Sequence, residues 1–109
     1  MINVPEVEDV KRILREWVSH YPRINRIYLF GSYVTEDNKI PSDIDIAITI
    51  DGTSNDTALS YWCIEGEKLQ NQLKNFFGYK VHLEWFDARE TPTVKQGLDK
   101  GCIMVYERG

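Results

Sequence analysis

Apolar residues in the first part of the chain recur at the spacing of a helix. They lie three or four positions apart, at Val7, Val10, Ile13, Leu14, Trp17 and Val18. This spacing places them on one stripe of a helix. Pro5 suits the first turn of that helix, and His20-Tyr21-Pro22 ends it because the residue before a proline avoids the helical region. We therefore expect an amphipathic helix between Pro5 and His20.

The apolar pattern of the remaining chain predicts strands and two further helices. Strands are expected at residues 24–30, 43–50, 81–86 and 102–106. A long helix is expected at 57–77, ended by Gly78, with an apolar face formed by Leu59, Trp62, Leu69, Leu73 and Phe76. A shorter helix starts at Thr91-Pro92 and ends at Gly101. This order indicates an α+β fold of two layers, in which the helices pack mainly on one face of the sheet.

Size and charge limit the classes of function. The chain has 109 residues, and we expect a single domain over residues 1–109. The formal net charge is -4, and the longest basic cluster is Lys11-Arg12, which argues against nucleic acid as the main partner. No apolar run approaches the roughly 20 residues of a membrane helix. Acidic residues interrupt the first ten positions, which excludes a signal peptide, so we expect a cytoplasmic protein.

The cysteines and tryptophans are expected to be structural. Cys63 and Cys102 lack the spacing of a metal site, so we expect them to be buried and reduced. Trp17, Trp62 and Trp85 follow helix or strand patterns, which favours the core or an interface over base stacking.

Candidate chemistry is concentrated at residues 42–50. Side chains alternate between the two faces of a strand, so the isoleucines at 44, 46, 48 and 50 share a face that must be buried. Asp43 and Asp45 share the other face. At an effective dielectric of about 20, unit charges ~5–6 Å apart repel by roughly 3 kcal/mol. Mg²⁺ would offset this repulsion, because it prefers oxygen ligands and keeps positions for water and phosphate. The competing interpretation of the pair alone is a solvated face of an edge strand.

The preceding strand ends abruptly at Gly31-Ser32. Glycine allows a turn and a close approach of the backbone to a ligand. Successive backbone N–H groups, together with the Ser32 hydroxyl, can hold phosphate oxygens. Alone, the pair indicates no more than an ordinary tight turn. A strand that ends in Gly-Ser, joined by a loop to a strand that begins with Asp-x-Asp, is much more specific than either feature.

This combination resembles the signature of a known superfamily. Gly31-Ser32, ten intervening residues and then Asp43-Ile44-Asp45 are similar to the motif of polymerase-β-type nucleotidyltransferases. The flanking residues Leu29-Phe30 and Ile46-Ala47-Ile48 resemble its minimal bacterial and archaeal members, and the resemblance spans essentially the whole chain. It implies a mixed sheet flanked by helices. It also implies two Mg²⁺ ions, a nucleoside triphosphate substrate such as ATP, and a third carboxylate on a later strand.

Glu84 is the expected third carboxylate. In residues 81–86, Leu83 and Trp85 share one face. If these two pack with the isoleucines, Glu84 lies on the face of the two aspartates. Asp87 has the opposite parity and ranks second. His82 shares the Glu84 face but sits one pleat away, roughly 7 Å along the strand, so we expect a structural or partly exposed histidine.

The resemblance implies two-metal, in-line nucleotidyl transfer. Asp43, Asp45 and Glu84 would be the metal ligands and catalytic residues, and Gly31 and Ser32 would orient the outer phosphates. Minimal domains of this kind resemble the partners of HEPN-type helical proteins in toxin–antitoxin pairs. The implied acceptor is therefore a hydroxyl of a partner protein, which receives AMP from ATP.

Two alternatives share this fold. Many relatives carry Arg or Lys soon after the Gly-Ser pair, whereas this chain has Tyr33, followed by Glu36, Asp37 and a single basic Lys39. These departures favour a partner-binding module without catalysis, or a nucleotide sensor that binds without transfer. The small size is compatible with either a homodimer or a second protein as partner. The pattern does not reveal the acceptor or the preferred base.

Overall fold

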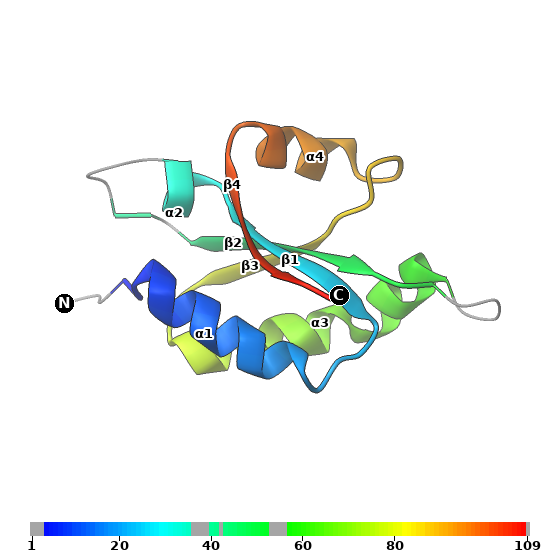
Figure 1. Ribbon diagram of the computed structural model, residues 1–109, viewed down its shortest axis with the longest axis horizontal. Helices are drawn as coiled ribbons and strands as arrows, with labels where there is room; N and C mark the ends of the chain where they lie inside the picture. Colours follow the sequence, from blue (N-terminus) through cyan, green and yellow to red (C-terminus); the bar gives the residue numbers. More distant parts are fainter. Residues whose placement is uncertain (1–3, 36–39, 42, 53–56, 109) are drawn as a thin grey trace.

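The computed structural model describes residues 4–35, 40–41, 43–52 and 57–108 (Figure 1). In chain order the elements are α1 Val7–Val18, β1 Ile24–Phe30, α2 Ser32–Thr35, β2 Ile44–Ile50, α3 Ala58–Phe77, β3 Val81–Trp85, α4 Pro92–Asp99 and β4 Cys102–Glu107. Each predicted helix and strand is present, and the α+β class is confirmed. The predictions about Glu36, Asp37 and Lys39 fall outside the described residues.

The four strands form one mixed sheet in the order β3-β2-β1-β4. β1 runs antiparallel to β2 and β4, whereas β2 and β3 run parallel and are connected through α3. Because of these directions, the end of β1 lies beside the starts of β2 and β3. Asp45 is paired with Phe30 on one side and with His82 on the other. Three strand ends therefore meet around Asp45.

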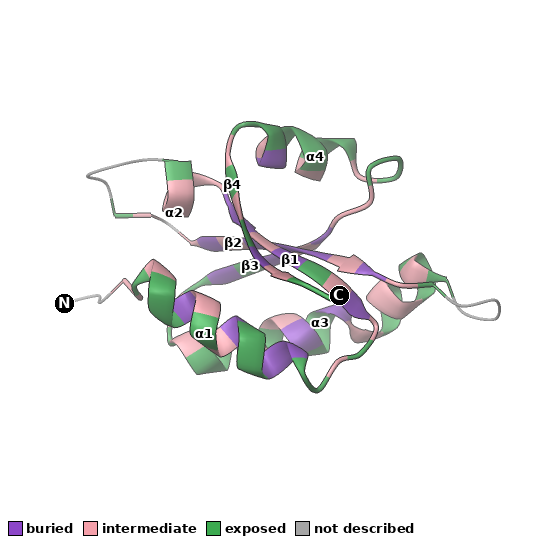
Figure 2. Ribbon diagram, viewed as in Figure 1, coloured by how far each residue is buried: buried purple, intermediate pink, exposed green. Residues whose placement is uncertain are grey.

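The main core lies between the sheet and the two longest helices. Figure 1 shows α1 and α3 on the same side of the sheet, and Figure 2 shows buried residues along the sides of these helices that face it. The predicted isoleucine face is confirmed, since Ile44, Ile46 and Ile48 are fully buried. They pack with Leu14 of α1 and Leu73 of α3. Burial of each such side chain stabilises the fold by about 1.5–3 kcal/mol.

A smaller core lies on the opposite face of the sheet, under α4. Phe30, Ala47 and Leu98 form this cluster, and Val94 packs against it. Helices therefore cover both faces, and the expectation that they pack mainly on one face holds for α1 and α3 but not for α4 (Figure 1). The reason is local. Phe30 and Ala47 lie on the aspartate side of the sheet and need an apolar cover.

The helix ends follow their sequence signals, with one exception. The Thr57 hydroxyl accepts a hydrogen bond from the Ser60 N–H at 3.1 Å, and Gly78 ends α3 in the left-handed conformation at φ 59°. Pro5, in contrast, lies outside α1, because Glu6 is extended and acts as the N-cap. The Pro5 carbonyl instead accepts a hydrogen bond from the Tyr33 hydroxyl.

Two predictions of burial are wrong. Cys63 and Cys102 are both exposed, because Cys63 lies on the outer side of α3 and β4 is an edge strand. On the predicted apolar face of α3, Leu69 and Leu73 are fully buried, but Leu59 and Phe76 are more than half exposed. Both ends of α3 still pack on the main core, but through Ala58 and Phe77 in place of Leu59 and Phe76. Trp17 and Trp85 are buried in the core as expected.

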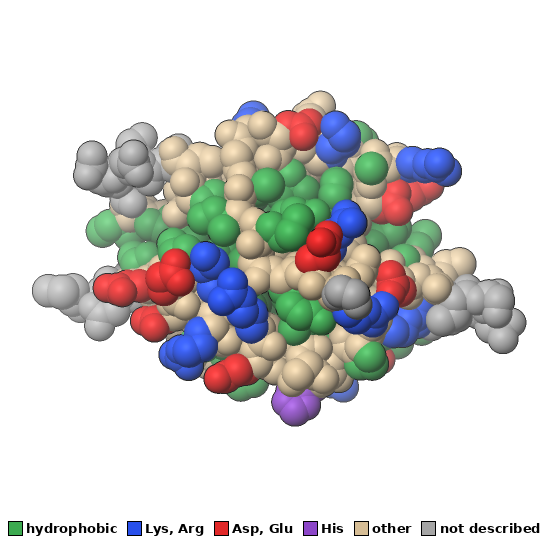
Figure 3. Space-filling view, in the orientation of Figure 1, with side chains coloured by type: hydrophobic (Ala, Val, Ile, Leu, Met, Phe, Trp, Pro, Cys, Tyr) green, Lys and Arg blue, Asp and Glu red, His purple; other side chains and the backbone are tan. Residues whose placement is uncertain are grey.

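The surface charge is mixed. On the face drawn in Figure 3, acidic and basic side chains are interspersed. Within the described parts of the chain, every helix is too short or too polar to cross a membrane.

Candidate functional site

The candidate site lies on the face of the sheet opposite α1 and α3. Asp45 pairs with His82 across the parallel strands, and Glu84 pairs with Ala47 one step further along β3. Residues paired in this way point to the same side of a sheet. Leu83 and Trp85 are buried with the isoleucines, so Glu84 lies on the aspartate side, where strand parity placed it.

Four titratable side chains form a connected cluster there. Asp43, Asp45 and His82 each offer a ligand atom, and these atoms all lie within 4.8 Å of one another. His82 Nδ1 lies 3.7 Å from Asp45 Oδ1, and His82 Nε2 lies 3.0 Å from Glu84 Oε1. The imidazole therefore stands between the Asp45 and Glu84 carboxylates.

Gly31 allows the backbone to pass directly beside the Asp45 carboxylate. Its φ is +74°, and a Cβ added to it would lie 2.1 Å from Asp45 Oδ2. Its carbonyl accepts hydrogen bonds from the N–H groups of Val34 and Thr35, both at 3.1 Å, which starts α2. The predicted turn is present. The approach of the Gly31 backbone to a ligand stays a prediction. The closest group is the carboxylate itself.

The surroundings of Asp45 disfavour its ionised form. Burial raises the pKa of Asp45 to about 6, and the charge and hydrogen bond of Asp43 and the charge of Glu84 act in the same direction. His82 partly opposes this effect and lowers the pKa. At neutral pH without a cation, the folded protein therefore carries an unfavourable negative charge at this position.

This shift predicts that Asp45→Asn stabilises the metal-free protein at neutral pH. The folded state binds a proton at Asp45 up to about pH 6, whereas the unfolded chain releases it near its ordinary pKa of about 3.9. The resulting stability is present below pH 4 and is lost as the pH rises through 6. After allowance for solvent screening, we expect the variant to be about 1–2 kcal/mol more stable than the wild type at pH 7.5.

Urea unfolding in EDTA at pH 4.5, 6.0 and 7.5 measures this difference, which should shrink towards the acidic end. Asp99→Asn serves as the control, because Asp99 is an exposed residue of α4 that pairs with Lys95 at 3.1 Å. An Asp45→Asn protein no more stable than the wild type at pH 7.5 would contradict the expectation.

A pocket of about 200 Å³ opens onto the cluster. Its lining comes from three strands and from α4, and consists of Phe30, Asp45, His82, Glu84, Thr93 and Val94. Pockets for whole small molecules usually measure about 300–1,000 Å³. The enclosed space therefore suits a cation with a phosphate group, and a larger ligand would extend onto the neighbouring surface.

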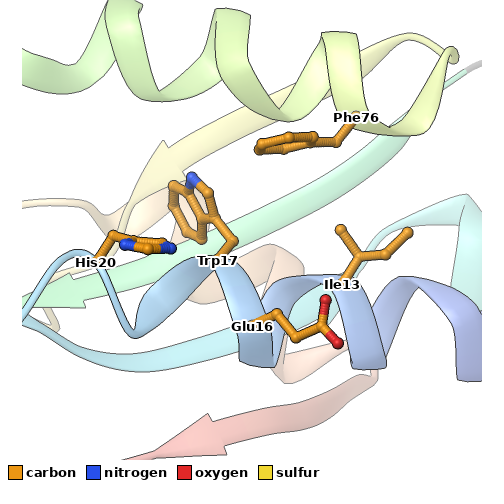
Figure 4. Close-up of a pocket in the computed structure, with 5 residues that line it drawn as sticks. All are labelled: Ile13, Glu16, Trp17, His20 and Phe76. Carbon is orange, nitrogen blue, oxygen red and sulfur yellow. The ribbon is translucent and has the colours of Figure 1, made fainter.

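A second pocket, of about 280 Å³, lies between α1 and α3 on the other side of the sheet (Figure 4). Ile13, Trp17 and Phe76 give it a largely apolar lining, beside Glu16 and His20. This lining lacks the clustered carboxylates that a phosphate-bound cation needs. The candidate site therefore lies at the carboxylates and not in the groove between the helices.

Tyr33 and Asp87 serve structural roles. The Tyr33 hydroxyl donates to the Pro5 carbonyl, and its ring packs against the main core. Burial, with the charges of Asp9 and Glu6, raises the pKa of Tyr33 to about 12, so the hydroxyl stays protonated. Asp87 Oδ1 accepts hydrogen bonds from the Arg89 and Glu90 N–H groups in the turn after β3.

His82 is the site residue that sequence reasoning set aside. Along β3 alone it lies one pleat from Glu84, and the sequence of one strand does not show its partner on the neighbouring strand. The parallel register of β2 and β3 is what places it opposite Asp45. If β2 and β3 are aligned from their starts as parallel neighbours, His82 falls opposite Asp45, and this alignment is the signal that could have identified it.

The donor set fits a divalent cation. Asp43 and Asp45 supply carboxylate oxygens, His82 adds a nitrogen, and the missing side chain of Gly31 leaves room for the Asp45 carboxylate. Carboxylates at this distance are stabilised by a shared cation and repel without one.

Comparisons with known proteins identify relatives of the chain in sequence and in fold. A family model described as "Polymerase beta, Nucleotidyltransferase" matches residues 12–108. Two relatives from Methanocaldococcus jannaschii, named as candidate protein adenylyltransferases MJ1217 and MJ0128, are 27% and 26% identical over 105 residues. Each alignment covers 96% of this chain and 100% of the relative.

Solved structures share the fold. A crystal structure of a toxin–antitoxin with AMP-PNP superposes with a TM-score of 0.64 at 23% identity, over 92% of this chain and 74% of that chain. The MntA-HepT toxin–antitoxin structure gives a TM-score of 0.61 at 19% identity, over 93% of this chain and 73% of that chain. At these identities the likeness establishes the arrangement of helices and strands.

Proposed function

This chain belongs to the polymerase β nucleotidyltransferase family, and from that premise we propose that it transfers AMP from ATP to an acceptor hydroxyl with the help of Mg²⁺. The observation that carries the proposal is the juxtaposition of Asp43 and Asp45 with the Gly31 turn at the open end of the sheet. An enzyme that positions a triphosphate needs both a cation site and a close backbone approach.

The two aspartates would hold the cation in this proposal. Mg²⁺ accepts carboxylate oxygens and keeps positions for water and phosphate, and two ions are expected between Asp43, Asp45 and the triphosphate. When bound, the ions neutralise the triphosphate and stabilise the pyrophosphate that leaves. The Gly31-Ser32 turn would orient the outer phosphates through backbone N–H groups and the Ser32 hydroxyl.

Glu84 completes the proposed catalytic set. A carboxylate has two oxygens, so Glu84 can hold His82 with one and a cation or the acceptor proton with the other. The acceptor oxygen forms a bond to the α-phosphorus, the bond from that phosphorus to the bridging oxygen breaks, and Glu84 receives the acceptor proton. The remaining contribution of the protein is to hold the acceptor hydroxyl and the α-phosphate close together and correctly oriented.

A protein is the proposed acceptor. The two relatives from Methanocaldococcus jannaschii carry the name of protein adenylyltransferases, and the structural neighbours are toxin–antitoxin assemblies. On that basis we propose a HEPN-type helical partner as the acceptor, with a homodimer as the competing assembly.

One observation favours a second candidate, a partner-binding module without transfer. Among the residues that the structure describes, those that line the carboxylate pocket include no lysine or arginine to counter a triphosphate. In such a module Asp43 and Asp45 would be present, but the protein would transfer no nucleotide.

Calorimetric titration of ATP into the protein, with and without Mg²⁺, tests the proposal. We expect binding that requires the cation. Incubation with the partner and either α- or γ-labelled ATP then separates the two candidates, because transfer of AMP carries only the α label to the acceptor. If ATP fails to bind at millimolar concentration, even with the partner present, the transferase proposal is wrong.

A further inference from the structure

His82 stands where a third ligand of the cation site belongs. It comes from β3, directly opposite Asp45 of the neighbouring parallel strand. Its Nδ1 lies 3.7 Å from Asp45 Oδ1, and its ligand atom falls within 4.8 Å of those of both aspartates. One cation with bonds of about 2.0–2.2 Å joins ligand atoms up to about 4.4 Å apart, which includes the 3.7 Å between His82 Nδ1 and Asp45 Oδ1.

Glu84 sets the tautomer that this role requires. Its Oε1 lies 3.0 Å from His82 Nε2, so the carboxylate stabilises a proton on that nitrogen. The lone pair is then on Nδ1, the nitrogen that faces Asp45. A histidine that binds metal through one nitrogen and donates to a carboxylate through the other is a recurrent arrangement in metal sites.

His82 is also accessible to a cation that arrives from solvent. The His82 side chain is about half exposed at 56%, whereas that of Asp45 is 20% exposed. His82 and Glu84 line the same pocket as Asp45, and the imidazole is its more exposed neighbour. A cation that enters the pocket from solvent meets the imidazole and both carboxylates.

We propose that His82 is a direct ligand of the cation held by Asp43 and Asp45, and that Glu84 positions it. The proposal rests on the proposed function, because it concerns the same cation site. It assigns the site a mixed set of two carboxylates and one imidazole.

A mixed donor set changes the metal preference. Mg²⁺ favours oxygen ligands, whereas first-row transition-metal ions also accept imidazole nitrogen. The site should therefore favour these ions over Mg²⁺ by a larger margin than a site of carboxylates alone. Mn²⁺ is a stringent probe, because it is the weakest binder of the first-row series.

Pulsed EPR of bound Mn²⁺, without nucleotide, tests the ligand directly. Coordination by His82 should produce electron spin-echo modulation from a directly bound nitrogen, and labelling the histidines with ¹⁵N should change it. His82→Ala should remove the signal, whereas His20→Ala should keep it, since the chain has 2 histidines. Bound Mn²⁺ in the wild type without nitrogen modulation would overturn the proposal.

Titration with Mn²⁺ and Mg²⁺ gives the second readout. We expect His82→Ala to weaken Mn²⁺ binding about 10- to 100-fold, with a much smaller effect on Mg²⁺. His82→Asp should lower the ratio of Mn²⁺ to Mg²⁺ affinity about tenfold, because it restores an oxygen ligand. Glu84→Gln should weaken Mn²⁺ binding about tenfold while the nitrogen signal persists.

The outcomes separate this inference from the proposed function. If Mn²⁺ binds in a way that depends on Asp43 and Asp45 but not on His82, the inference is wrong and the transferase proposal stands. If neither Mn²⁺ nor Mg²⁺ binds, with or without ATP, both are wrong.

Discussion

Replacing Asp43 and Asp45 together by asparagine is expected to abolish Mg²⁺-dependent ATP binding and to slow transfer by about 1,000-fold or more. Neutral amides are poor ligands for a hard cation, and metal stabilisation of the transferred phosphate is worth several kcal/mol. Each 1.36 kcal/mol corresponds to a factor of ten in rate. Calorimetry measures the binding, and release of pyrophosphate in the presence of the acceptor measures the rate.

The double variant should remain folded, because it removes the mutual repulsion of two close carboxylates. Circular dichroism checks this, and Asp99→Asn provides an exposed aspartate whose loss should leave both readouts unchanged. A double variant that still binds ATP in a Mg²⁺-dependent manner would place the cation site elsewhere.

Replacing Gly31 by alanine should both destabilise the protein and damage the cation site. The added Cβ would lie 2.1 Å from Asp45 Oδ2, and the contacted side chain belongs to a central strand of the sheet. Overpacking of this kind costs about 1–3 kcal/mol, and the left-handed backbone adds about 1–2 kcal/mol for a residue with a side chain. Urea unfolding and Mn²⁺ titration measure the two effects.

Gly78→Ala is the matched control for this substitution. Gly78 has a similar φ of +59°, but a Cβ there would meet nothing within 4 Å. It should cost only the backbone term and leave Mn²⁺ binding unchanged. If the two variants lose equal stability and both bind Mn²⁺ normally, the close approach of Gly31 to Asp45 has no functional importance.

The regular elements could be predicted from the sequence because their signals are local. The isoleucines of β2 mark a buried face, and Thr57 and Gly78 mark the ends of α3. The cover of the opposite face was harder to predict. Ala47 is fully buried under α4, yet a small residue whose neighbours on the same face, Asp45 and Thr49, are polar carries little information about what packs on it.

The part of the site that depends only on the alternation of side chains along one strand could be predicted from the sequence. Parity along β2 and β3 correctly placed Asp45 and Glu84 on one face, and Asp43, which directly precedes β2, lies beside Asp45 and His82. The position of His82 depends on which strand pairs with which, and in what register, and these are properties of the assembled sheet. The exposure of Cys63 and Phe76 likewise depends on which side of α3 packs on the sheet, which helical periodicity alone does not settle.

The sheet divides the apolar interior into two parts of unequal size. The larger part, under α1 and α3, holds most of the buried side chains, whereas α4 rests on the small cluster of Phe30, Ala47 and Leu98. Thr93 and Val94 of the same short helix form a wall of the carboxylate pocket. Mutations in α4 can therefore reshape what the pocket admits while the main core keeps the chain folded. Evolution or an engineer could change the specificity of such a protein by altering eight residues, Pro92–Asp99.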